Sequence, residues 1–301
     1  MGFFRRHQGR ASYGLFSNYS HYLPGIGGMF ALLALFLLGA LIGNLTVSAL
    51  ELVSKEFAMT YGTVISYPIM FIPILLFASA KSRMNDGFET GYALDSNHFG
   101  KLGGPVLAVA VSVATVAAAF IADGFNSLLP PVPEWFEAAM KQIMDCPVWV
   151  TLISVSVFAP LFEEWLCRGL VLRGLLQKKS PAVAIIVSAL FFAVLHMNPW
   201  QALPAFMLGL LFGYVYYKTG SLKLTMLMHC VNNTMAVVFS KIPSLAEAES
   251  FSEVMSPWMY ACIYIAAVII AASIIMVLRA IPAVKEGARS NCDEVLPMSI
   301  S

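Results

Sequence analysis

The sequence predicts an all-α fold, a polytopic transmembrane helical bundle of about eight spans. Hydrophobic residues make up 59% of the 301 residues and charged residues only 12%, whereas a soluble domain is about one quarter charged. Long apolar runs recur along the chain, and about 20 such residues cross a hydrocarbon core of about 30 Å. Lys and Arg also alternate between successive loops. These observations exclude water as the main solvent of the protein. We therefore expect it to lie in the lipid bilayer, which is its predicted partner.

Eight apolar segments account for the predicted spans. They cover residues 27–50, 64–80, 104–122, 148–176, 181–197, 200–217, 222–240 and 257–279. We divide the chain into 1–147, with three spans and an interfacial loop, 148–240, with four core spans, and 241–301, with the last span and a cytoplasmic tail. We expect no separate soluble domain.

The outward loop at residues 123–147 contains a short amphipathic stretch. Large apolar side chains recur there at near-helical spacing among charged ones. The apolar set is Trp135, Phe136, Met140 and Ile143, and the charged set is Glu134, Glu137 and Lys141. This pattern predicts a helix that lies in the membrane interface.

The basic residues predict the orientation of the bundle. Of the 18 Lys and Arg residues, fifteen fall on one set of alternating loops and three, Lys55, Lys141 and Lys241, on the other. Arg168 and Arg173 are counted with the cytoplasmic half of the fourth span. Cytoplasmic loops are enriched in Lys and Arg, so we expect both termini in the cytoplasm of a multi-pass plasma (inner) membrane protein. The sequence has no nucleic-acid signature, and we expect no such partner.

Polar side chains inside the predicted spans are few and clustered. An ionisable group at the centre of a span costs roughly 2.5 to 3.5 kcal/mol on insertion scales, so each needs a partner or a function. They concentrate on the fourth, fifth and seventh spans. The set is Glu163, Glu164, Arg168, His196, His229 and Asn233.

Helical geometry assigns these residues different tasks. Glu164 and Arg168 are four residues apart and share a helix face, which predicts an ion pair. Glu163 is rotated by about 100° from Glu164 and has no cationic partner on its helix, as suits a general base. His229 and Asn233 are also four apart, so an imidazole and an amide could together donate hydrogen bonds to an oxyanion.

The same residues are predicted to share one depth. Glu163 and His196 are equally far, about 25 Å, from the turn between the fourth and fifth spans. His229 and Asn233 lie roughly 12 to 20 Å beyond the turn near Gly220. Because part of the first hairpin projects into the cytoplasm, all four side chains can occupy one layer.

These motifs resemble those of the CPBP intramembrane proteases, also described as the CAAX prenyl endopeptidase or Abi family. The family pattern is EExxxR, then FxxxH, then HxxxN, which this chain matches at Glu163-Glu164 with Arg168, at Phe192 with His196, and at His229 with Asn233. The resemblance covers roughly residues 148–240. It implies an intramembrane endopeptidase acting on a membrane-associated peptide or protein, and eukaryotic relatives suggest prenylated CAAX substrates.

The resemblance also implies roles for individual residues. Glu163 and His196 would activate a water, His229 and Asn233 would stabilise the oxyanion, and Glu164 with Arg168 would support the site. Family members have been described both as metalloproteases and as glutamate-dependent proteases. Glu163, His196 and His229 are therefore candidate zinc ligands, but the chain contains no HExxH motif and we favour chemistry without metal.

The sequence is also compatible with two other functions. One is a non-catalytic binding or immunity protein of the same fold, and the other is a transporter whose buried carboxylates relay ions or protons. A GxxxG pattern at Gly209 and Gly213 predicts a close helix contact, either within the chain or between chains.

Overall fold

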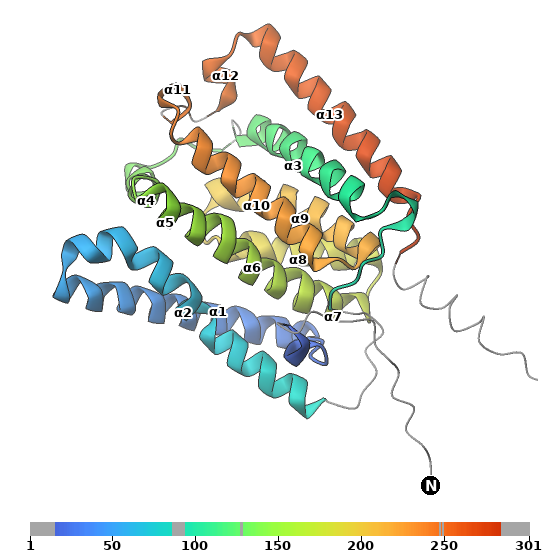
Figure 1. The fold of residues 1–301 in the computed structure, drawn as a ribbon, viewed down its shortest axis with the longest axis horizontal. Coiled ribbons are helices and arrows are strands. Elements are labelled where there is room, and N and C mark those ends of the chain that lie inside the picture. Colours follow the sequence, from blue (N-terminus) through green and yellow to red (C-terminus); the bar gives the residue numbers. More distant parts are fainter. Residues whose placement is uncertain (1–15, 86–93, 127–128, 247, 249, 284–301) are drawn as a thin grey trace, which may run out of the picture.

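The computed structural model describes residues 16–85, 94–126, 129–246, 248 and 250–283. Every regular element in this part of the chain is a helix, which confirms the all-α prediction (Figure 1). Helical segments occupy all eight predicted spans. They are α1 (Ile26–Val53), α2 (Lys55–Met84), α3 (Gly104–Asn126), the segment Val148–Leu176, α8 (Pro181–Leu195), α9 (Pro199–Thr219), α10 (Leu222–Phe239) and α13 (Pro257–Arg279).

Five of these segments are long and apolar enough to cross a membrane by themselves. They are α1, α2, α3, the segment Val148–Leu176 and α13. Helix α8 is apolar but has only 15 residues, and α9 and α10 are not in this set. For α10 the cause is chemical, because it carries His229, Asn232 and Asn233 in its middle. The described residues thus hold five candidate spans, with α8, α9 and α10 packed among them.

Helices α1 and α2 form a tight hairpin, and both extend into the residues between the predicted spans 27–50 and 64–80. Only Ser54 separates the two helices, and its Oγ accepts a hydrogen bond from the Phe57 amide at 3.2 Å, which caps α2. The helix therefore continues through polar residues that hydropathy alone assigns to a loop. The hairpin packs closely, since a Cβ added at Gly39 would lie 1.8 Å from the Met70 carbonyl oxygen.

The segment Val148–Leu176 contains two π-helical stretches between α-helical ones. It comprises α5 (Val148–Thr151), the π-helical η3 (Leu152–Phe158), α6 (Ala159–Glu164), the π-helical η4 (Trp165–Leu172) and α7 (Arg173–Leu176). The Glu163-Glu164 pair closes α6, directly before the second π-helical stretch. Wide π-helical turns occur frequently at functional sites.

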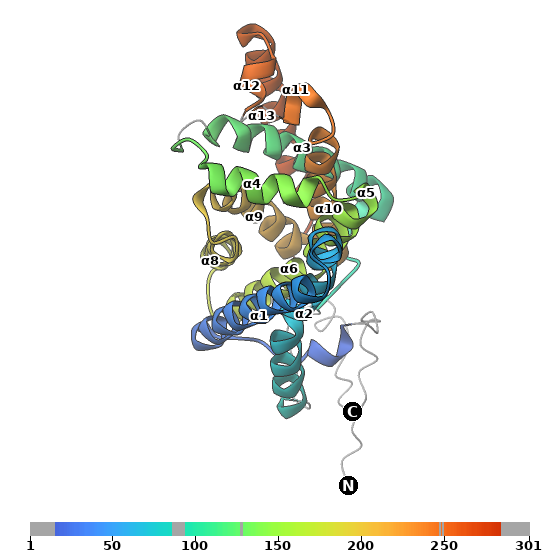
Figure 2. The same ribbon diagram turned by 90° about the vertical axis from the view of Figure 1, so that its left-hand side faces the viewer.

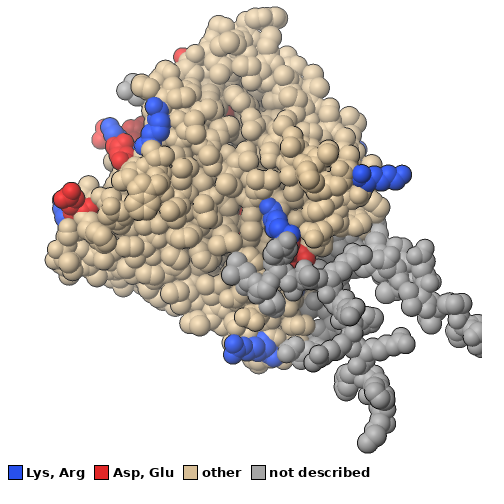
Figure 3. Space-filling view, viewed as in Figure 1, with Lys and Arg blue, Asp and Glu red and all other residues tan. Residues whose placement is uncertain are grey.

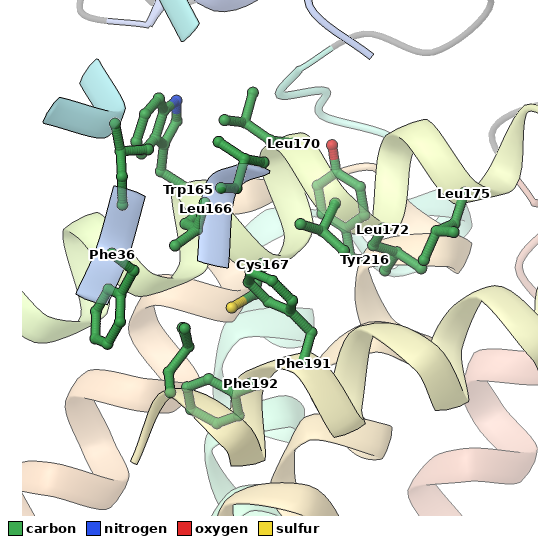
Figure 4. Close-up of a cluster of buried hydrophobic side chains, with 14 of the residues drawn as sticks. Phe36, Trp165, Leu166, Cys167, Leu170, Leu172, Leu175, Phe191, Phe192 and Tyr216 are labelled. Atoms are coloured by element: carbon green, nitrogen blue, oxygen red, sulfur yellow. The ribbon is translucent and has the colours of Figure 1, made fainter. Parts of the chain in front are cut away.

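A hydrophobic core holds this segment between α1 and α8. Figure 4 shows Phe36 of α1, Trp165 and Cys167 of η4, and Phe191 and Phe192 of α8. All five side chains are buried. Cys167 is fully buried within this core, where a free cysteine packs as a small hydrophobic side chain.

The GxxxG pattern is a contact within the chain, between α9 and α8. A Cβ added at Gly209 would lie 3.1 Å from the Cβ of Ala189, and one at Gly213 would lie 3.1 Å from Cγ2 of Ile185. Small residues at these positions let the two helix backbones approach each other closely.

The loops gather at two ends of the bundle, in the predicted alternation. At one end Lys223 pairs with Asp95 at 3.3 Å, and Lys218 donates to the Arg279 carbonyl at 3.3 Å. At the other end Ser250 Oγ donates to Asp123 at 3.0 Å. On the face shown in Figure 3, charged side chains gather toward the two ends and the surface between them is uncharged.

The predicted amphipathic helix is present as α4 (Glu134–Met144), at the same end as α11 (Pro243–Ala246) and α12 (Phe251–Val254), as Figure 2 shows. One detail of the charge count needs correction. Arg168 and Arg173 have no exposed surface, so they are buried side chains rather than charges of the cytoplasmic loop.

Candidate active site

Four predicted site residues line one cavity of about 450 Å³. They are Glu163, His196, His229 and Asn233. Because α6, the end of α8 and the middle of α10 meet there, motifs far apart in sequence converge, as the depth argument expected. Helices α1, α2 and α4 also contribute residues to the cavity wall, so the site extends beyond residues 148–240.

Glu163 presents two carboxylate oxygens with different surroundings. Oε1 accepts a hydrogen bond from the hydroxyl of Tyr67 on α2. Oε2 is buried and has no hydrogen-bond partner within the described chain. The nearest basic atom that faces it is Nε2 of His229, at 4.0 Å. A water molecule can bridge two polar atoms at that separation.

Glu164 occupies the centre of a buried charge cluster. Its Oε1 accepts from Arg168 Nη1 at 2.7 Å, so the ion pair that helical spacing predicts is present, and neither side chain has exposed surface. The same oxygen lies 3.1 Å from His229 Nδ1. Glu164 therefore also fixes the orientation of the His229 ring, with Nδ1 toward Glu164 and Nε2 toward Glu163.

Arg168 has further partners that hold it in place. Its Nη2 donates to the Gly209 carbonyl at 3.1 Å. Its guanidinium lies over the rings of Phe192 at 4.6 Å and Phe212 at 5.3 Å. A cation stacked on aromatic faces is stabilised by their quadrupoles, most strongly where water is excluded. Arg168 thus ties α8 and α9 to the helix that carries both glutamates.

His196 follows the last residue of α8, and its two ring nitrogens have different surroundings. Its Nδ1 lies 3.0 Å from the Phe192 carbonyl oxygen, so Nδ1 carries the proton and donates. In a neutral ring this leaves Nε2 as the acceptor nitrogen in the cavity wall. No hydrogen bond joins His196 to Glu163 among the described residues, and a bridging species would be needed to connect them.

Asn233 is held by two neighbours. Its Nδ2 donates to the Val155 carbonyl at 2.6 Å, and its Oδ1 accepts from Asn232 Nδ2 at 3.1 Å. One N–H of the amide is therefore occupied, and a second N–H remains for a ligand. The shared helix face predicted for His229 and Asn233 is present, since both side chains line the cavity.

Sequence reasoning missed three polar residues of the cavity, Tyr67, Gln201 and Asn232. Asn232 could have been found, because a polar side chain in the middle of a span usually has a partner or a function. Tyr67 had no such signal. It lies on α2, 96 residues before Glu163, and its ring stacks near Phe71 like any aromatic residue of a core.

The metal candidates do not form a ligand set. Within the described residues no group of three or more His, Cys, Asp or Glu side chains could hold a metal ion. Tyr67 donates to one carboxylate oxygen of Glu163, and Nε2 of His229 lies 4.0 Å from the other. A catalytic zinc site needs three protein ligands, and Glu163, His196 and His229 do not form such a group among the described residues.

The rest of the cavity wall is apolar. Four methionines line it, Met70, Met140, Met144 and Met197, together with aromatic and aliphatic side chains. Methionine is flexible and polarizable, so such a wall adapts to apolar side chains of different shape. A cavity of this size with a few converging polar groups is typical of a ligand site.

Known proteins are similar to this chain over the segment that carries the three motifs. Residues 145–235 match the model of the family described as "Type II CAAX prenyl endopeptidase Rce1-like". The Bacillus subtilis (strain 168) protein described as "Putative membrane peptidase YdiL" is 23% identical over 107 residues, which cover 36% of this chain and 43% of YdiL. The chain therefore matches less than half of the length of that relative. No solved structure matches.

Proposed function

Because residues 145–235 carry an Rce1-like domain of the CAAX prenyl endopeptidase type, we propose that this protein is an intramembrane endopeptidase. It would hydrolyse a peptide bond of a membrane-associated peptide or protein. The observation that carries the proposal is the pair formed by Glu163 Oε2, which has no hydrogen-bond partner among the described residues, and His229 Nε2, 4.0 Å apart in the wall of a 450 Å³ cavity.

Glu163 acts as the general base in this proposal. A water at Oε2 gives its proton to the carboxylate while its oxygen attacks the peptide carbonyl carbon. The hydrogen bond from Tyr67 holds Oε1, which leaves Oε2 to face the cavity. Nε2 of His196 accepts a hydrogen bond from the same water and orients it. Glu163 then returns the proton to the leaving nitrogen as the C–N bond breaks.

His229 and Asn233 stabilise the negative oxygen of the tetrahedral intermediate. Asn233 donates through the N–H that Val155 leaves available. His229 donates from Nε2 when both ring nitrogens carry protons, and the Glu164 carboxylate 3.1 Å from Nδ1 offsets that charge. Donors held in place before the reaction are worth about 10²- to 10³-fold in rate when one is removed. No step requires a metal ion.

The protein is a multi-pass integral membrane protein, and we propose the plasma membrane with both ends of the chain in the cytoplasm. Removing the buried Arg168 and Arg173 from the loop count leaves thirteen basic residues on one set of loops against three on the other. This excess still satisfies the positive-inside rule.

The proposal is tested with the purified protein in detergent and a panel of single-span membrane peptides. We expect mass spectrometry to find two fragments whose masses sum to the peptide plus one water. A peptide that binds in a pull-down and is never cleaved would instead support the non-catalytic alternative.

A further inference from the structure

We infer that the cavity opens to the non-cytoplasmic side of the membrane, beneath α4, and takes peptide segments that lie at that surface. The identity of the occupant as a substrate rests on the proposed function. The position of the opening rests only on the architecture and on the distribution of charge.

The basic end of the bundle is closed by packing. Tyr216 is buried and donates to the Leu94 carbonyl at 2.9 Å, and Asp95 accepts from the Leu222 amide at 2.8 Å. Arg173 is also fully buried and donates to the Ser20 carbonyl. None of these residues lines the cavity. A peptide from the cytoplasm would have to pass through this packed layer to reach Glu163.

The opposite end carries the tryptophans. Trp135, Trp149, Trp200 and Trp258 lie at the start of α4, α5, α9 and α13, which all begin at this end. Only Trp165 lies elsewhere, buried in the core. Tryptophan is enriched at both membrane–water interfaces, so this ring marks a surface of the bilayer, and its position opposite the basic loops assigns that surface to the non-cytoplasmic side.

The site lies near this surface because α8 is short. Its 15 residues span about 22 Å, less than the hydrocarbon thickness of about 30 Å. The helix starts at the basic end and stops at His196, so the turn to α9 is recessed below the opposite surface. The cavity reaches this turn, since Met197, Trp200 and Gln201 line it, which gives it a short path to the outside.

Helix α4 lies over the recess and forms its rim. Trp200 Nε1 donates to the Pro130 carbonyl at 2.9 Å, and the ring of Phe136 lies 5.4 Å from that of Trp200. Met140 and Met144 of α4 line the cavity, whereas Glu137 on the same helix is exposed. An amphipathic helix placed in this way keeps its polar face in the interface and turns its apolar face to the site.

These features define the class of occupant. A peptide that enters at the rim meets methionine and aromatic side chains before it reaches Glu163, so it must present apolar side chains near the scissile bond. It must also be available at the non-cytoplasmic surface. A segment confined to the cytoplasmic face, such as the C-terminus of a cytoplasmic protein, does not reach the cavity.

The test measures access of water-soluble reagent and needs no enzyme activity. In a background where all five cysteines are replaced by serine, one cysteine is introduced as Gln201→Cys in the cavity wall, Glu137→Cys on the exposed face of α4, or Met84→Cys at the basic end. Met84 is 72% exposed and serves as the matched control. Sealed right-side-out vesicles are treated with a membrane-impermeant maleimide, before and after permeabilisation.

We expect Glu137→Cys and Gln201→Cys to be labelled in sealed vesicles, and Met84→Cys only after permeabilisation. Labelling of Gln201→Cys only after permeabilisation, or in neither condition, would overturn the inference. Labelling of Met84→Cys in sealed vesicles would overturn the orientation itself. Because no substrate is involved, failure of the peptidase proposal would leave these results interpretable.

Discussion

The hydroxyl of Tyr67 donates a hydrogen bond to Oε1 of Glu163. This contact joins α2 to α6, and Tyr67 lies outside the segment 145–235 that matches the family model. It fixes the rotation of the carboxylate, so that Oε2 faces Nε2 of His229. The N-terminal hairpin is thus part of the proposed site and not only a membrane anchor.

Replacement of Tyr67 by Phe should lower kcat while substrate binding and folding stay close to wild type. A hydrogen bond to a charged group contributes about 1.5 to 3 kcal/mol, which corresponds to roughly 10- to 100-fold in rate. Tyr61→Phe on the same helix is the control, because Tyr61 packs on Phe57 and Trp149 rather than on the site.

A double variant separates positioning from a general loss of structure. If Tyr67 acts through Glu163, adding Tyr67→Phe to Glu163→Gln should not lower the residual rate further. Additive losses in the double variant, or an unchanged kcat in Tyr67→Phe alone, would contradict the role assigned to Tyr67.

The two adjacent glutamates should differ in their effect on stability. Glu164→Gln leaves Arg168 buried without its counter-charge, which typically costs about 3 to 5 kcal/mol. Glu163→Gln removes no ion pair with Arg168 and should unfold near the wild-type temperature. Thermal unfolding in detergent measures both. Equal losses of stability in the two variants would refute the assignment of Glu164 to the ion pair and Glu163 to catalysis.

Removing both charges should recover part of this loss. In Glu164→Gln with Arg168→Gln no unpaired charge remains, so the double variant should be more stable than Glu164→Gln alone. Recovery should be incomplete, because Arg168 also donates to the Gly209 carbonyl and stacks on Phe192. A double variant less stable than Glu164→Gln would show that those other contacts outweigh the ion pair.

Gly39→Ala should destabilise the α1–α2 hairpin and disturb Tyr67 with it. The new methyl group would lie 1.8 Å from the Met70 carbonyl oxygen, so the helices must separate, and such overpacking costs about 1 to 3 kcal/mol. Gly27→Ala, in the same helix, meets no atom within 4 Å and should be neutral or stabilising by up to about 1 kcal/mol. Identical unfolding temperatures for the two variants would argue against the close hairpin contact.

Chelators should leave peptidase activity unchanged. The expectation follows from the donor set, in which Tyr67 already holds one oxygen of Glu163 and no third ligand joins Glu163 and His229 among the described residues. Activity is measured before and after dialysis against a chelator. Loss of activity with recovery on added zinc would refute metal independence.

The sequence alone predicted the helices and the meeting of the three motifs, because hydropathy and helical spacing are local properties. It placed Glu163, His196, His229 and Asn233 at one depth, and they line one cavity. The Glu164–Arg168 pair also followed from spacing within one helix.

Contacts between distant helices were not accessible in this way. The hydrogen bond from Tyr67 and the contact of His229 with Glu164 depend on how α2 and α10 pack on α6, which no local pattern encodes. The start of α2 was also missed. The helix begins directly after its cap at Ser54, and its first turns are polar in sequence but helical in the fold.

The most direct test of catalysis compares wild type with Glu163→Gln on one cleaved membrane peptide. Both proteins should bind the peptide equally in a pull-down, because Gln preserves the volume of the side chain. Cleavage followed by mass spectrometry should fall by about 10²- to 10⁴-fold in Glu163→Gln, as expected for loss of a general base. Wild-type cleavage rates in Glu163→Gln would contradict the account, since they would place the chemistry on another residue.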